Sequence, residues 1–138
     1  MRAVVDTNVV AYYLLGTSPF VDEVAGFWRS VEGPMAPALW EAELANVVWR
    51  ATRAGIVSLA EGRNRLILAR AIGIRSIASR TLWQGALVRA VATNVAVYDT
   101  MFVELAARER VPLATFDTRV LEAFPAIAAR PRSLTVAR

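Results

Sequence analysis

Short apolar segments alternate along this chain with longer segments that have the pattern of amphipathic helices, and this alternation limits the folds open to it. Residues 2–5 and 112–116 have the pattern of short buried strands, and weaker strands are expected around 35–36 and 126–129. Helices are expected over residues 8–15, 18–31, 39–53, 58–73, 80–92, 100–110 and 118–124. Short apolar strands that alternate with helices favour an α/β domain in which helices cover a mostly parallel sheet.

The size of the chain indicates one domain. It has 138 residues, of which 56% are hydrophobic, and this is enough for one compact core and too little for two. The sequence contains no internal repeat, low-complexity tract or linker. We therefore expect a single domain over residues 1–138.

Several helix ends carry local signals. Ser18 is a typical N-cap, and Pro19 would then occupy the first helical position. Ser58 and Glu61 have the spacing of a capping box at the start of another helix. The segment "VAVYD" is expected to link two helices, the second of which would begin at Thr100.

The chain contains no cysteine, no histidine and no lysine, so that all 16 of its basic residues are arginine. Without cysteine there are no disulfides, zinc–thiolate sites or thiol nucleophiles. Without histidine the chain lacks the commonest general base and the imidazole ligands of transition metals, and without lysine it lacks a Walker A loop. Catalysis would therefore rely on carboxylate, hydroxyl, amide or guanidinium groups, or on a hard cation.

The formal net charge of +4 suits an anionic partner such as nucleic acid or an acidic peptide. A solubilising surface explains the same charge equally well. No stretch approaches the roughly 20 apolar residues that cross a bilayer. Asp6 interrupts the N-terminal apolar run before it could form a signal sequence. We expect a soluble, cytoplasmic protein without a membrane partner.

Four of the 12 acidic residues occupy unusual positions. Asp6 and Asp117 each follow a predicted buried strand, and Asp99 follows the apolar "VAVY". Ligands of open parallel sheets bind beyond the carboxyl ends of the strands, so these acids would converge if the strands are neighbours. Glu43 lies on a mostly apolar helical stripe, where an unpaired carboxylate is costly.

Each acid alone has a structural explanation. An aspartate at a helix start is a common N-cap, and Glu43 could pair with an arginine such as Arg50. Thr7 and Asn8 could be turn residues with local backbone bonds. Four acids in one cleft would repel one another unless a cation lay among them, and oxygen ligands without histidine or cysteine select Mg²⁺ or Mn²⁺.

Three segments resemble, in order, the motifs of PIN-domain ribonucleases, and specifically of the VapC-type toxins of bacterial toxin–antitoxin pairs. These segments are "VVDTNVV", "PALWEAELANVVWR" and "VYDTMFVELAARERVPLATFDTRVL". The match extends from residue 3 to about 124. A lone Asp-Thr-Asn is a weak signal, whereas the last segment, preceded by the "ELANV" helix, is fairly specific.

The resemblance implies four acids at a metal site and three polar side chains that support them. The acids are Asp6 after the first strand, Glu43 on a helix, Asp99 at the start of the late helix, and Asp117 of the Thr-x-Asp motif. The supporting residues are Thr7, Asn8 and Thr115. Asp6 and Asp99 are the leading candidates for direct ligands. The other two acids would bind a second ion, hold ligating waters or accept the proton of a water.

The resemblance also implies an architecture and partners. The fold would be a three-layer α/β/α sandwich, and the activity would depend on Mg²⁺ or Mn²⁺. The protein would form a homodimer or a toxin–antitoxin hetero-oligomer. A small antitoxin would inhibit it by covering the active cleft with its C-terminal segment, and the substrate would be RNA.

Three functions remain open at this point. The first is a metal-dependent endoribonuclease that acts as a toxin. The second is a catalytically silent PIN-like module that binds RNA or regulates a partner, against which the intact set of acids argues. The third is a phosphotransfer enzyme of the haloacid-dehalogenase or response-regulator kind, which also places aspartates at strand ends but normally uses a lysine that this chain lacks.

Arginines and tryptophans are secondary candidates for RNA contacts. With the four acids set aside, the 16 arginines outnumber the remaining acids two to one. The candidates for backbone contacts are Arg53, Arg63, Arg65, Arg70, Arg75 and Arg80, although each alone is explained as solvated helix charge. The helical patterns favour core or interface packing over base stacking for Trp28, Trp40, Trp49 and Trp83. Trp49 and the apolar residues of the 58–73 helix form the expected dimer face.

Overall fold

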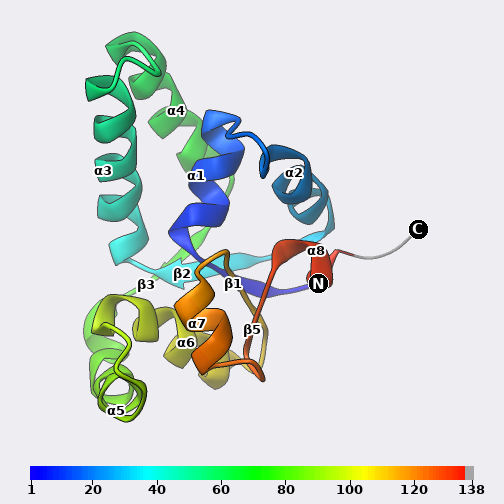
Figure 1. Cartoon of the computed structure of the whole chain (residues 1–138), viewed down its shortest axis with the longest axis vertical. Coiled ribbons are helices and arrows are strands. Elements are labelled where there is room, and N and C mark those ends of the chain that lie inside the picture. Colours follow the sequence, from blue (N-terminus) through cyan, green and yellow to red (C-terminus); the bar gives the residue numbers. More distant parts are fainter. Residues whose placement is uncertain (136–138) are drawn as a thin grey trace.

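The computed structural model describes residues 1–135, and its centre is a five-stranded sheet (Figure 1). The strands are β1 (Ala3–Val5), β2 (Pro34–Pro37), β3 (Arg75–Ile77), β4 (Leu113–Ala114) and β5 (Ala128–Ala129). Their order is β3-β2-β1-β4-β5, and every neighbouring pair is parallel. All three residues of β1 are buried, as expected for a strand covered on both faces.

The chain leaves the central strand β1 in two directions. β2 and β3 follow on one side, whereas β4 and β5 lie on the other. Val5 of β1 pairs with Ala114 of β4, so that these two strands end side by side. The strand order reverses between β1 and β4, and in open parallel sheets the ligand crevice lies at such a reversal.

Helices cover both faces of the sheet, as Figure 1 shows. The helices on one face are α1 (Thr7–Leu15), α2 (Val21–Ser30), α3 (Leu39–Arg53) and α4 (Leu59–Ala71). Those on the other are α5 (Trp83–Thr93), α6 (Val97–Glu109) and α7 (Thr118–Ala123). Because crossovers between parallel strands are right-handed, the reversal of direction puts the later helices on the opposite face. The expected α/β/α sandwich is confirmed, with a sheet that is entirely parallel.

Several predicted helix boundaries agree with the structure. α3 has the predicted bounds, and α1 begins one residue earlier than expected. The capping box of α4 is present: Glu61 N donates to Ser58 Oγ at 3.1 Å, and Ser58 N donates to Glu61 Oε1 at 3.3 Å. Side chains cap the starts of α1 and α4, through Asp6 and Ser58, whereas α3 begins without a side-chain cap.

Other boundaries were wrong. Ser18 does not cap α2, because Phe20 N and Val21 N both donate to the Thr17 carbonyl and close a turn before the helix begins at Val21. "VAVYD" is not a link, since α6 begins at Val97 and holds Asp99 in its first turn. A short 3₁₀ helix, η1 (Ser79–Thr81), precedes α5 where the helix was expected to begin at residue 80. Neither β3 nor α8 (Pro131–Leu134) was predicted.

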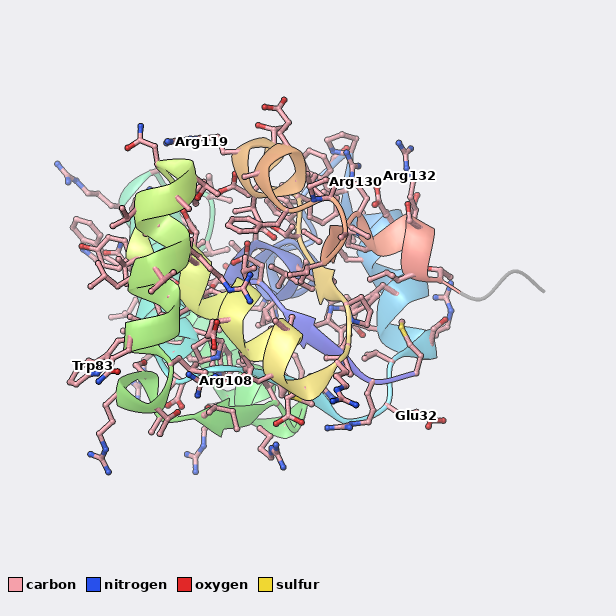
Figure 2. The ribbon with its side chains drawn as sticks, turned by 90° about the horizontal axis from the view of Figure 1, so that it is seen from below. Glu32, Trp83, Arg108, Arg119, Arg130 and Arg132 are labelled. Atoms are coloured by element: carbon pink, nitrogen blue, oxygen red, sulfur yellow. The ribbon has the colours of Figure 1, made fainter. Side chains whose placement is uncertain are left out.

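A carboxylate on α6 holds α5 in place. Glu104 receives hydrogen bonds from Arg89 of α5 at 2.9 Å and from Arg108 at 2.6 Å, and Figure 2 labels Arg108. Although burial opposes it, these bonds hold the pKa of Glu104 below its usual value. A Cβ at Gly85 would collide with this carboxylate, so a larger residue there would have to displace the Glu104 side chain from its two arginines.

Within residues 1–135, no single helix is long and apolar enough to cross a membrane. By length and composition alone, α5 and α6 together would qualify, but they form a pair that is bent by 115°.

Candidate active site

Asp6 lies directly after β1 and is nearly buried, with 8% of its surface exposed. Its Oδ1 accepts a hydrogen bond from Thr7 N at 2.7 Å, which caps α1, and its Oδ2 accepts one from Thr115 Oγ1 at 2.7 Å. Burial, with smaller contributions from the charges of Asp99 and Glu43, raises the pKa of Asp6 to about 7 although these two bonds lower it. Asp6 is therefore a helix cap that also carries a costly buried charge.

Thr115 connects two of the predicted acids. It follows β4 and is fully buried. Its hydroxyl donates to Asp6 and accepts a hydrogen bond from Asp117 N at 3.0 Å. Asp117 in turn caps α7, because its Oδ1 accepts from Arg119 N at 2.9 Å and from Val120 N at 3.3 Å. One hydroxyl thus sets the position of both strand-end carboxylates.

An aromatic cluster fixes the loop between these two residues. The ring of Phe116 lies 5.1 Å from that of Tyr12 and 5.0 Å from that of Phe20. The Arg130 guanidinium lies 4.6 Å from the Phe116 ring centre and also forms a two-pronged ion pair with Glu23. The amide of Phe116 donates to Asn8 Oδ1 at 3.4 Å. These contacts hold the Thr115–Asp117 segment against α1.

Glu43 lies half-buried on α3 and faces the first turn of α1. Thr7 Oγ1 donates a hydrogen bond to Glu43 Oε1 at 2.8 Å. Burial raises the pKa of Glu43 above its usual value, and the charge of Asp99 adds to this effect, whereas the bond from Thr7 lowers it. The partner that the sequence suggested, Arg50, forms no ion pair with Glu43 in the described part of the chain.

Asp99 is the acid that interacts with the other three. Its charge raises the pKa of Asp6 and of Glu43, and the pKa of Asp99 itself is raised by burial and by the charge of Asp117. Arg119 has the opposite effect on Asp99. The four predicted acids therefore come from four separate segments of the chain to one region, beyond the adjacent ends of β1 and β4.

The donor set fits a hard divalent cation. All four side chains offer carboxylate oxygen, the ligand that Mg²⁺ and Mn²⁺ prefer. A cation would offset the cost of burying the charges of Asp6, Glu43 and Asp99, which is the main cause of their raised pKa values, and also the smaller repulsion between the acids. Within residues 1–135, however, no group of three or more acids has its side chains placed to hold one ion directly. The fit rests on donor chemistry and charge.

A groove of about 340 Å³ lies beside Glu43, between α1 and α3. Its lining includes Asn46 and Arg50, which are not among the site residues expected from the sequence, and also Tyr12. Asn46 and Arg50 lie three and seven residues after Glu43, a spacing that puts them on the same helix face. This helical spacing is the sequence signal that could have assigned the two residues to the site.

The arginines predicted to contact RNA do not line this groove. Arg53 lies over the Trp49 ring at 5.4 Å, and Arg75 pairs with Glu109 at 3.5 Å. Most of the predicted arginines belong to α3, α4 and β3. The structure instead brings Arg50 to the groove and Arg119 near Asp99.

Two of the four tryptophans pack inside the protein, as predicted. Trp28 Nε1 donates to the Val9 carbonyl at 3.3 Å, and Trp40 is 6% exposed. Trp49 and Trp83 are each 54% exposed; Figure 2 shows Trp83 at the edge of the molecule.

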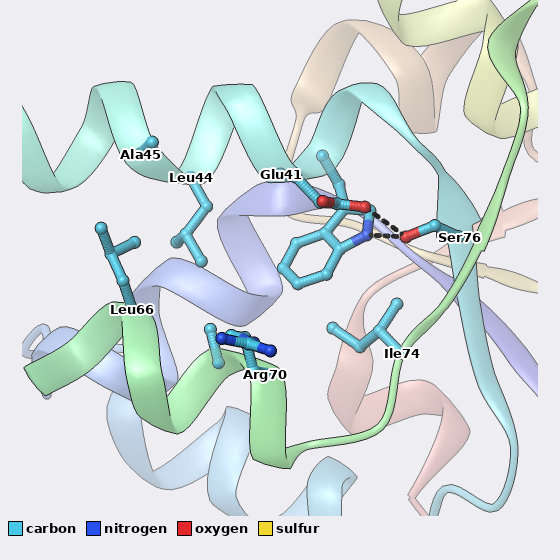
Figure 3. Close-up of a pocket in the computed structure, with 9 residues that line it drawn as sticks. Glu41, Leu44, Ala45, Leu66, Arg70, Ile74 and Ser76 are labelled. Carbon is cyan, nitrogen blue, oxygen red and sulfur yellow. Dashed lines mark hydrogen bonds between the residues drawn. The ribbon is translucent and has the colours of Figure 1, made fainter.

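Trp40 also forms a wall of a second hollow, shown in Figure 3. This cavity of about 410 Å³ lies between α3, α4 and β3. Trp40 Nε1 donates to Ser76 Oγ at 2.8 Å, and Ser76 Oγ donates to Glu41 Oε1 at 2.7 Å. None of the four clustered acids lines it, so it is separate from the site.

The metal-free protein is expected to lose stability as the pH rises from about 4 to about 7. A carboxyl group whose pKa rises from 3.8 to about 7 on folding stabilises the fold fully below pH 4, and this contribution is lost as the pH approaches 7. Glu43 and Asp99 act in the same direction. Glu23 and Glu104, whose pKa values are lowered, change the stability only at more acidic pH.

Urea unfolding in a chelator across this pH range measures the effect. Asp6 contributes at most about 1.4 kcal/mol per pH unit. Saturating Mn²⁺ should reduce or reverse the slope. A stability that is flat or rises with pH in the chelator would contradict the burial of these charges.

Comparison with known proteins places the chain in a family. The model of the PIN domain matches residues 3–127, which is nearly the whole chain. No curated protein matches the sequence. PIN domains are generally metal-dependent nucleases, and the arrangement of acids beyond β1 and β4 agrees with a nuclease-type function at that coarse level. The chain belongs to the PIN-domain family.

Proposed function

We propose that this PIN-domain protein is a Mg²⁺- or Mn²⁺-dependent endoribonuclease and the toxin of a type II toxin–antitoxin pair. The observation that carries the nuclease part is the convergence of four carboxylates where the strand order reverses. The charge of Asp99 raises the pKa of Asp6 and of Glu43, and the charge of Asp117 raises that of Asp99. The order and spacing of the sequence motifs support the toxin part. The cytoplasm is the expected place of action.

In this proposal, hydrogen bonds within the chain position the acids that would bind the cation. Asp6 and Asp99 would be the direct ligands. The hydroxyls of Thr115 and Thr7 donate hydrogen bonds to Asp6 Oδ2 and Glu43 Oε1, and Thr7 N donates to Asp6 Oδ1. Each carboxylate oxygen can accept more than one bond, so lone pairs of both acids remain available. A bound divalent ion lowers the pKa of a coordinated water and offsets charge on a phosphate.

Glu43 and Asp117 would assist the two direct ligands, Asp6 and Asp99. Asp117 has its Oδ1 committed to the start of α7, so its other oxygen is the one available to the site. Glu43 accepts one hydrogen bond and has a raised pKa, which suits a group that takes a proton from water. Both acids would thereby position or deprotonate the attacking water.

Homodimerisation and inhibition by a cognate antitoxin complete the proposal. Large apolar side chains stand exposed on the hairpin of α3 and α4, and they support this hairpin as the dimer face. They are Trp49, Ile56, Leu59, Ile67 and Leu68. Exposed apolar patches of this kind mark protein–protein contacts.

The nuclease proposal predicts that RNA is cut only with a divalent ion and intact acids. Asp6→Asn or Asp99→Asn should lower the cleavage rate at least about 100-fold, because each removes a direct ligand. EDTA should stop cleavage, and Mn²⁺ should restore it. Gel analysis of labelled RNA measures the products. Asp22→Asn, at an exposed acid on α2, is the matched control and should cut normally.

Cleavage that survives both EDTA and Asp6→Asn would overturn the metal-site proposal. Tight RNA binding without product at any metal concentration, unchanged by Asp99→Asn, would instead identify a catalytically silent binding module.

The toxin role has a separate test. Expression of the wild-type chain in bacteria should arrest growth, and Asp6→Asn should relieve the arrest. A short reading frame next to the gene, encoding a DNA-binding protein, should also relieve it when co-expressed. A chain that cuts RNA in vitro but leaves growth unaffected would contradict the toxin role alone.

A further inference from the structure

Arg119 lies next to the acid cluster and is positively charged, but the proposed chemistry gives it no role. It is exposed, and it belongs to the first turn of α7, the helix that Asp117 caps. Its Nη2 donates to the Asn94 carbonyl at 3.1 Å. Figure 2 shows Arg119 between α7 and the end of α5. The side chain thus bridges two segments on the sheet face opposite α1 and α3.

This guanidinium is positioned but not neutralised. Arg119 takes no part in the ion pairs found among residues 1–135. Asn94 uses one of its five N–H donors. Of the four that remain, two can bind an anion together. Such a planar fork matches the oxygens of a phosphate.

A hollow of about 480 Å³ opens beside Arg119, within the usual size range of ligand pockets. Besides Arg119, its polar lining residue is Asn94, at the end of α5. Its remaining lining is small and apolar, and consists of Ala90, Val91, Val95, Ala96 and Val97. Small apolar walls with one guanidinium and one amide suit a sugar and base attached to a phosphate.

The hollow and the groove near Glu43 lie in opposite helical layers. The groove lies between α1 and α3, in one layer, whereas the hollow lies in the other, at the junction of α5 and α6 and beside α7. Val97 lines the hollow, and Asp99 lies two residues after it in α6. Arg50 therefore shares the groove with Glu43 in one layer, and Arg119 lies near Asp99 in the other.

We propose that the hollow at Arg119 is the subsite for a nucleotide next to the scissile phosphate, with the Arg119 guanidinium binding the phosphate of that nucleotide. This inference rests on the proposed nuclease function and adds to it a defined contact on one side of the cut. Arg119 is a positioning residue here, because it holds the RNA strand and takes no part in bond cleavage.

RNA binding tests the subsite without requiring cleavage. Fluorescence anisotropy of a labelled single-stranded RNA is measured with the Asp6→Asn protein, alone and combined with Arg119→Gln. The second change should weaken binding about 10-fold, as for a lost charged hydrogen bond. The slope of log affinity against log salt should fall by about 0.7, the value for one phosphate contact on a single strand. Arg119→Lys should keep the slope and lose part of the affinity.

The matched control is Arg29→Gln, at an exposed arginine in the last turn of α2. It should change neither affinity nor slope. If Arg29→Gln and Arg119→Gln weaken binding equally, or if neither weakens it, the subsite is overturned, since only general charge or no contact would remain.

A second pair of variants avoids the bond between Arg119 and α5. Val91 lines the hollow and is 79% exposed, whereas Val88 lies on the same helix, is 71% exposed and does not line it. Val91→Glu puts a negative charge where the phosphate would bind and should weaken RNA binding about 10-fold. Val88→Glu should leave it unchanged. Equal binding by the two variants would contradict the subsite.

Cleavage kinetics separate this inference from the nuclease proposal. In the active protein, Arg119→Gln should raise KM several-fold with a smaller change in kcat. The effect should disappear for RNAs that lack nucleotides on one side of the cut. If the wild type cuts RNA and Arg119→Gln alters neither KM nor binding, the subsite alone fails. If no cleavage occurs but the binding effects remain, the nuclease proposal alone fails.

Discussion

The parallel pairing of β1 with β4 is the contact on which the site depends. The pairing brings Val5 next to Ala114, and the hydrogen bond from Asp6 N to the Ala114 carbonyl continues it one residue further. The bond from Thr115 to the Asp6 carboxylate then crosses between the two strand ends. Because Asp117 N donates to the same threonine hydroxyl, the second strand-end acid is fixed by the same pairing. A shift in this register would separate the two acids.

Hydroxyl groups allow the fold to keep carboxylates in a partly buried place. Thr115 and Thr7 each donate one proton to an acid, and both threonines are buried. Their bonds oppose the effect of burial on the pKa of Asp6 and Glu43 without cancelling it. Asp99 takes part in the repulsion that remains between the acids, and Arg119 lowers the pKa of Asp99. A divalent cation in this region would relieve the same repulsion. Metal binding would therefore also change how the stability of the fold depends on pH.

The sequence predicted those parts of the fold that short-range chemistry decides. The apolar segment of β1, the capping box of Ser58 and the bounds of α3 depend on neighbouring residues alone. β3 was missed because its Arg-Ser-Ile sequence is polar and it lies at the edge of the sheet. The four acids were found because each follows an apolar segment or interrupts an apolar stripe. The position of Arg119 near Asp99 depends on the packing of α7 against the end of α5, which no local pattern records.

Anomalous scattering from crystals soaked in Mn²⁺ tests the metal site most directly. The proposed site predicts a peak beyond the ends of β1 and β4, within coordination distance of carboxylate oxygens of both Asp6 and Asp99. The same soak of Asp99→Asn crystals should give a weaker peak or none, because a ligand is lost. A saturating soak that leaves the wild-type acids without a peak, or that places Mn²⁺ only elsewhere on the chain, would contradict the site.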